Sequence, residues 1–126
     1  MLNKGVRDEK KLKADKMLNT LLAYVFAPKI WNMEDTSLID NQLTDFDLTT
    51  VILDQIEEKD LIKVLDKYEM DWEQKEKFAD FLITYSVGNQ FDYKAKALAI
   101  YEQIQVDSKT FSFGISAKIA NLKKLM

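Results

Sequence analysis

The sequence predicts an all-α protein, and three observations carry that prediction. Only one proline and three glycines interrupt the 126 residues. No Asn-Gly or Asp-Gly pair, the strongest short hairpin signal, occurs in the chain. Apolar residues recur instead at every third or fourth position, the spacing that places side chains on one helical face. We therefore expect a single helical domain over residues 1–126, a bundle of five to six helices, with residues 1–10 frayed.

The first helix is expected to end before Pro28. Its apolar stripe comprises Ala14, Met17, Leu18, Leu21, Leu22 and Val25. Pro28 stops the pattern, because proline lacks a backbone donor and its ring clashes with the turn before it. Residues 29–44 are apolar without a sustained period, so we expect a packed loop there, with one short helical turn at 36–42.

Two short apolar stripes predict two helices in the middle of the chain. Their members are Leu48, Val51, Ile52 and Ile56 in the first, and Leu61, Val64, Leu65 and Tyr68 in the second. Asp45 and Asp47 precede the first stripe, where carboxylates accept the free amides of a helix N-terminus. We therefore expect both to be caps, and we expect Asp54 to face water.

The C-terminal part is predicted to form an antiparallel helical hairpin with a final helix packed on it. Asp71 and Gln74 have the spacing of a capping box, which opens a helix over 72–87, and the second helix is expected over 91–106. Three stripes carry this prediction: Phe78, Phe81, Leu82 and Tyr85; Ala97, Leu98, Tyr101 and Ile104; and Phe111, Ile115, Ile119, Leu122 and Met126. In the core we expect to find Leu21, Leu82, Leu98, Tyr101 and Ile119 largely buried.

The hairpin resembles the two packed helices of a tetratricopeptide repeat. Aromatic and small residues within 78–85 and 97–104 recur at intervals similar to those of the repeat signature. The connecting segment is longer than in that signature, and no proline closes the unit. The resemblance implies a helical hairpin, but a lone hairpin does not form the concave groove of stacked repeats.

A second resemblance covers about a third of the chain. The stretch from 92–98 through 107–113 is similar to the C-terminal part of a family of small bacterial helical proteins that has no established activity. This resemblance implies a helical fold and a bacterial source, and it implies no catalytic residues.

The composition excludes several kinds of chemistry. The chain has no histidine and no cysteine, so imidazole bases, the usual serine triads, histidine or cysteine metal sites and disulfides are absent. Neither of the common glycine-rich phosphate loops occurs. Asp45, Asp47 and Asp54 offer oxygen ligands, but a calcium loop starting at Asp45 would need glycine and glutamate where Thr50 and Ile56 stand. We expect no metal and no cofactor.

Charge is distributed unevenly along the chain. Residues 1–33 carry +4, residues 34–80 carry -10 and residues 81–126 carry +3. The basic residues of the first helix are Lys4, Arg7, Lys10, Lys11, Lys13 and Lys16. Acidic residues lie among them and no base-reading motif is present, so nucleic acid is disfavoured as a partner. We expect these lysines to meet the acidic middle of the chain, within one copy or across a dimer.

No segment is expected to cross a membrane. The longest continuous apolar run is Leu21–Ala27, whereas a spanning helix needs about 20 apolar residues. A chain without cysteine shows no sign of an oxidising compartment, so we expect a cytoplasmic protein.

Four aromatic residues lie off the apolar stripes and are the candidate binding residues: Trp31, Trp72, Tyr93 and Phe113. Such side chains are frequent at partner surfaces and in ligand pockets. We expect a non-enzymatic helical protein–protein interaction module that binds a protein partner or associates as a homodimer. Two alternatives remain open, a helical bundle that binds a small molecule and a metal-dependent enzyme built on carboxylates.

Overall fold

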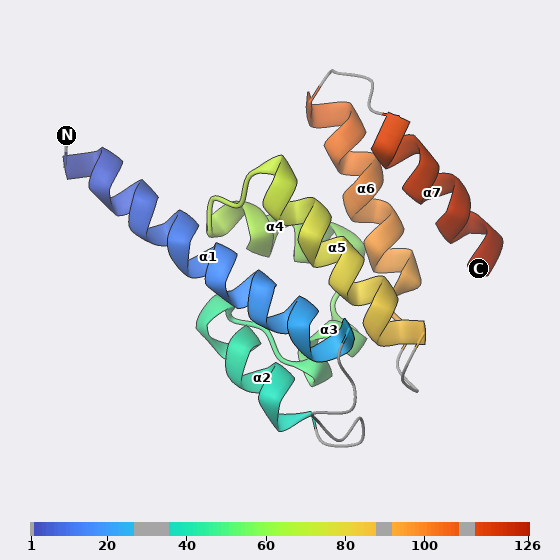
Figure 1. Cartoon of the computed structure of the whole chain (residues 1–126), viewed down its shortest axis with the longest axis horizontal. Helices are drawn as coiled ribbons and strands as arrows, with labels where there is room; N and C mark the ends of the chain where they lie inside the picture. Colours follow the sequence, from blue (N-terminus) through green and yellow to red (C-terminus); the bar gives the residue numbers. More distant parts are fainter. Residues whose placement is uncertain (1, 27–35, 88–91, 109–112) are drawn as a thin grey trace.

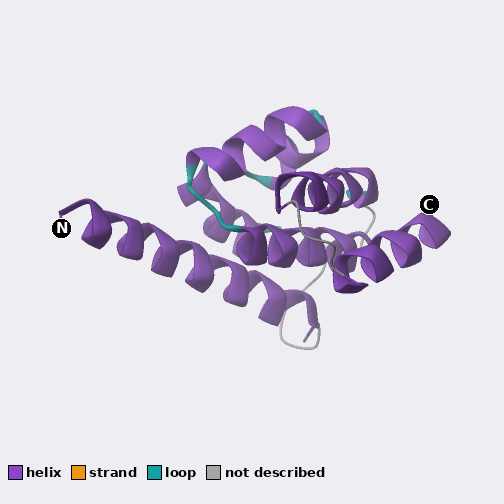
Figure 2. Cartoon of the chain, turned by 90° about the horizontal axis from the view of Figure 1, so that it is seen from above, coloured by secondary structure: helices purple, strands orange, loops and turns teal. Residues whose placement is uncertain are grey.

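The computed structural model describes residues 2–26, 36–87, 92–108 and 113–126, and these residues form helices and no strand (Figures 1 and 2). The elements are α1 (Leu2–Phe26), α2 (Ser37–Leu43), the short 3-10 helix η2 (Thr44–Phe46), α3 (Thr50–Gln55), α4 (Glu58–Lys67), α5 (Trp72–Val87), α6 (Lys94–Ser108) and α7 (Phe113–Leu125). The all-α prediction is confirmed. Within the described ranges there are seven α-helices rather than five or six, because the turn expected at 36–42 is a complete helix, α2.

Helix α1 packs along the bundle with its C-terminal half. Ala14, Met17, Leu18 and Leu21 are buried, as the stripe predicts, whereas Leu22 and Val25 are partly buried. The N-terminal turns of α1 extend past the rest of the molecule (Figures 1 and 2).

The capping box at the start of α5 is confirmed. The backbone amide of Gln74 donates to Asp71 Oδ1 at 2.9 Å, and that of Asp71 donates to Gln74 Oε1 at 3.0 Å. The Gln74 side-chain amide also donates to the Lys11 carbonyl at 3.1 Å and to Asp15 Oδ1 at 2.9 Å. One buried side chain therefore caps α5 and holds α1 against it.

The predicted capping roles of Asp45 and Asp47 are wrong. Residues 44–46 form η2, so the next helix begins later, and Thr49 caps it by accepting the Ile52 amide at 3.1 Å. Asp47 ends η2 with a left-handed backbone, φ 60°. Its carboxylate accepts from Lys67 Nζ at 2.8 Å and from Tyr68 Oη at 2.6 Å, and these bonds hold the pKa of Asp47 below its usual value. Asp54 is exposed, as expected.

The C-terminal hairpin is confirmed: α5 and α6 pack antiparallel, and α7 packs against α6 (Figure 1). The buried residues of this layer include Phe78, Phe81, Leu82, Tyr85, Ala97, Tyr101, Ile104, Ile115 and Leu122. Leu98 and Ile119 were expected in the core, but they are only partly buried and pack against its edge. Phe111 lies outside the described residues, and the resemblance to a tetratricopeptide repeat stays a prediction.

Polar contacts fix the position of α7. Lys118 Nζ donates to Glu76 Oε2 at 2.5 Å and to Asp80 Oδ2 at 2.9 Å. The Tyr101 hydroxyl donates to Asp80 Oδ1 at 2.5 Å, so one carboxylate of α5 binds side chains from both α6 and α7. Gln105 Nε2 donates to Ser116 Oγ at 2.9 Å, which sets the antiparallel register of α6 and α7.

Candidate partner-binding surface

The four aromatic candidates do not form one site. Trp31 lies outside the described residues. Trp72 is 49% exposed at the start of α5, and Phe113 is 83% exposed at the start of α7. Because α5 and α6 run antiparallel, these two residues lie at the same end of the hairpin.

Tyr93 is not a surface residue, so its prediction as part of a partner surface is wrong. Its side chain is 1% exposed, and its ring stacks on Tyr85 with centroids 6.1 Å apart. Its hydroxyl donates to the Thr50 carbonyl at 3.2 Å. Residues just before a helix are often solvent-exposed, but here the chain turns inward, and Tyr93 ties the start of α6 to α3.

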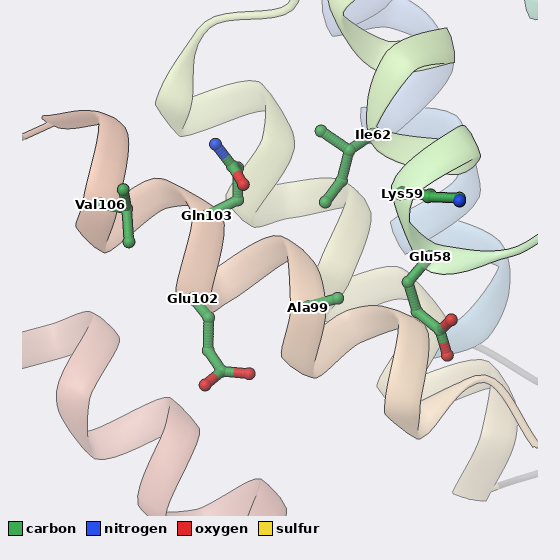
Figure 3. Close-up of a pocket in the computed structure, with 7 residues that line it drawn as sticks. All are labelled: Glu58, Lys59, Ile62, Ala99, Glu102, Gln103 and Val106. Carbon is green, nitrogen blue, oxygen red and sulfur yellow. The ribbon is translucent and has the colours of Figure 1, made fainter.

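An open groove lies where α4 crosses α6 (Figure 3). Its volume is about 410 Å³. The lining residues are Glu58, Lys59 and Ile62 from α4, and Ala99, Glu102, Gln103 and Val106 from α6. None of them is buried, and Val106 is 70% exposed. The groove is therefore a shallow surface feature rather than an enclosed cavity.

The groove combines apolar side chains with two carboxylates. Ile62, Ala99 and Val106 give it apolar area between the two helices. Glu58 and Glu102 form no ion pair with any described residue, although lysines of α4 pair with their own neighbours. Apolar area bordered by charges without partners is typical of a surface that is completed by binding.

Helix α7 supplies the opposite charge beside this groove. It has no acidic residue, and Lys123 and Lys124 near its end are exposed and form no ion pair within the described part of the chain. Phe113, Ala117 and Lys124 share a face, since they are spaced by four and seven residues, and all three are exposed. We call the surface formed by the groove and the exposed side of α7 the α4–α6–α7 face.

The cluster of Asp80, Tyr101 and Lys118 holds helices together rather than offering a reactive group. Burial, together with the hydrogen bond to Asp80, raises the pKa of the Tyr101 hydroxyl. Burial alone would lower the pKa of Lys118, but the carboxylates of Glu76 and Asp80 outweigh it and raise that pKa. Both groups therefore keep their protons at neutral pH, and neither is a base.

Lysines of α1 pair with the acidic middle of the same chain. This is the first of the two expected arrangements, pairing within one copy rather than across a dimer. Three pairs join α1 to the segments around η2 and the start of α5: Lys10 with Glu69 at 3.8 Å, Lys11 with Asp71 at 3.3 Å, and Lys13 with Asp45 at 4.0 Å. All six side chains are about half exposed to solvent, between 45% and 65%. Part of the basic surface is thus already paired with carboxylates of the chain itself.

The described residues contain neither a metal-binding cluster nor a membrane-spanning helix. No group of three or more Asp, Glu, His or Cys residues there is placed to hold a metal ion. None of the helices there combines the length and the apolar character required to span a membrane.

Comparison with known proteins finds no match to a family model, to a curated protein or to a solved structure.

Sequence patterns did not single out the groove. Ile62 and Val106 are apolar residues next to the core stripes of α4 and α6, not members of them, and each stripe alone explains its helix. Val106 alone gave a signal, since it is an exposed apolar side chain on the polar side of α6, and such residues are candidates for contact with a partner.

Proposed function

We propose that this chain is a non-enzymatic protein–protein interaction module that binds through its α4–α6–α7 face. The observation that carries the proposal is the groove between α4 and α6, where Ile62, Ala99 and Val106 line the same opening as Glu58 and Glu102, two carboxylates that form no ion pair with a described residue. Apolar contacts supply most of the stabilisation in such an interface, and charges around them select the partner.

The shape of the groove favours a macromolecular partner over a small molecule. Its volume of about 410 Å³ falls within the range of roughly 300–1,000 Å³ found for ligand pockets. A ligand pocket, however, encloses most of its ligand, and every residue lining this groove is at least partly exposed. A helix or another broad surface can cover it, whereas a small molecule would stay largely in water.

Exposed Phe113 extends the binding surface beyond the groove. It lies at the start of α7, at the end of the hairpin where α6 finishes with Val106 in its last two turns. Large aromatic side chains are among the residues that most often dominate interface energies. Leaving such a ring in water has a cost that binding removes.

Site-specific photocrosslinking tests the proposal. A benzoylphenylalanine replaces Gln103 in the groove, and a matched control replaces exposed Asn19 on α1. In cells that make the full chain, we expect a discrete crosslinked species from position 103 only. Its yield should fall when Val106→Asp is added, because the charge disrupts apolar contact at an exposed site without disturbing the core.

Two results would overturn the proposed function. One is the absence of any adduct from position 103. The other is the same set of adducts from positions 103 and 19, since that would show random collision rather than a specific surface.

A further inference from the structure

We propose that the occupant of the α4–α6–α7 face is a second copy of this chain, related to the first by a two-fold axis parallel to α6. This inference rests on the proposed function, because it names the partner of the same surface. It follows from the order of the three helices, their register and their charges.

Helix α6 lies between α4 and α7. It packs against both, and Figure 3 shows α4 and α7 on opposite sides of it. A two-fold axis parallel to α6 exchanges these two sides. It places α4 of each copy opposite α7 of the other, so the same contact forms twice.

The register along α6 brings complementary residues to the same level. Gln105 contacts Ser116, and the helices run antiparallel, so Lys124 lies near the level of the first turns of α6. Figure 3 shows Glu58 beyond Ala99, toward the start of α6. Rotation about an axis parallel to α6 leaves positions along it unchanged, so Lys124 of one copy meets Glu58 of the other.

Two apolar residues, Phe113 and Val106, also lie at matching levels along α6. Phe113 lies at the level of the last turns of α6, where Val106 lines the groove. In the proposed dimer it packs against that end of the groove in the second copy. Burial of the exposed ring on the partner's apolar surface then supplies the main driving force.

Like charges are kept apart at the axis. The two copies of Glu102 would meet if both side chains projected straight outward from α6. Figure 3 shows Glu102 directed to the side of α6 away from α4, toward α7. In the dimer each Glu102 therefore points toward the other copy's α4, where Lys59, which pairs with Glu57 at 3.6 Å in its own chain, is exposed beside the groove.

The size of the face reaches the lower limit for a specific dimer interface. Fifteen residues make α6 about 22 Å long, and three neighbouring helices span about 30 Å. Such a face covers roughly 600 Å² on each copy, or about 1,200 Å² in total, at the lower end of specific protein interfaces.

A charge swap tests the pairing of Glu58 with Lys124. Sedimentation equilibrium is run at low salt on the full-length wild type, on Glu58→Lys, on Lys124→Glu and on the double variant, with Lys16→Glu on α1 as the control. We expect a wild-type dimer, at least about tenfold weaker association for each single variant, and recovery of most of the affinity in the double variant. Lys16→Glu should not change the affinity, since Lys16 is exposed outside the proposed face. Both changed residues are exposed, and circular dichroism confirms that each variant folds.

The outcomes separate the two proposals. A monomeric wild type up to about 200 µM, or a double variant no better than its weaker parent, overturns the second-copy inference. If position 103 still yields a specific adduct with a different protein, the proposed function stands and only the identity of the partner is wrong. A dimer whose affinity responds equally to Lys16→Glu also contradicts the pairing.

Discussion

Lys118 Nζ lies 2.9 Å from Asp80 Oδ2, and this ion pair joins the last helix of the chain to the first helix of the hairpin. The same carboxylate accepts the Tyr101 hydroxyl, so α5, α6 and α7 meet at one group. The position of α7, and with it the exposed row of Phe113, Ala117 and Lys124, depends on this junction.

Replacement of Lys118 by methionine should loosen α7. The change keeps the aliphatic stem but leaves the partly buried carboxylates of Glu76 and Asp80 without their cation. We expect a loss of about 1–2 kcal/mol in the free energy of unfolding, because the ammonium is itself partly exposed. Urea unfolding followed by circular dichroism measures it, and an unchanged stability would show that α7 is held by its apolar contacts alone.

Truncation of a leucine should lower the unfolding free energy more at the centre of the core than at its edge. Leu82 is fully buried, so Leu82→Ala should cost about 2–5 kcal/mol of unfolding free energy. Leu98 is partly buried and packs on the core, so Leu98→Ala should cost about 1–2 kcal/mol. Denaturant titration of both variants provides the comparison, and equal losses would contradict the burial described for Leu98.

Buried tyrosines predict a loss of stability in alkali. Burial raises the pKa of Tyr85 to about 12 and raises the pKa values of Tyr93 and Tyr101 as well. A group with a raised pKa in the folded state stabilises that state fully below its unfolded pKa, about 10 for tyrosine, and this contribution is lost as the pH rises toward the folded value. For Tyr85 the loss amounts to about 2–3 kcal/mol by pH 12.

The measurement for this prediction is the unfolding free energy between pH 8 and about 12, with tyrosinate absorbance recorded in parallel. Stability should fall above about pH 10, and the buried hydroxyls should ionise only as the chain unfolds. Constant stability through this range, or early ionisation of all five tyrosines, would contradict the described packing.

Tyr93→Phe should lower stability without changing association, whereas Phe113→Ala should weaken association with little change in stability. Tyr93→Phe removes the hydroxyl that donates to Thr50, so unfolding free energy should fall by about 1 kcal/mol and association should not change. Phe113→Ala removes an exposed ring, so stability of the single chain should hardly change while association weakens. Sedimentation and thermal unfolding of the two variants test this prediction. Weaker association of Tyr93→Phe alone would show that Tyr93, rather than Phe113, contributes to the binding surface.

Much of the fold followed from local patterns. The stripe of α1, the capping box of Asp71 with Gln74 and the hairpin of α5 and α6 are each encoded by residues close in sequence. The roles of Asp47 and Tyr93 were not encoded in this way. Asp47 binds Lys67 and Tyr68, and Tyr93 binds Thr50, in each case through contacts across the fold that no local spacing reveals.

The candidate surface was predictable only in part. The exposure of Phe113 and Trp72 agrees with their positions off the stripes. The groove requires α4 and α6 to cross so that Ile62 meets Ala99 and Val106, and such a crossing depends on tertiary packing. That Glu58 and Lys124 form no ion pair within the described part of the chain likewise becomes visible only once the helices are in place.

Cysteine crosslinking across α6 tests the central claim most directly. The chain has no cysteine, so Ala99→Cys introduces a single thiol on the exposed side of α6, and Asn41→Cys on α2 is the matched control. A two-fold axis parallel to α6 places residue 99 opposite its own counterpart. A short bismaleimide should therefore convert Ala99→Cys, but not Asn41→Cys, to a covalent dimer of twice 14.7 kDa. Crosslinking of neither variant, or of both equally, would show that a second copy does not dock on this face.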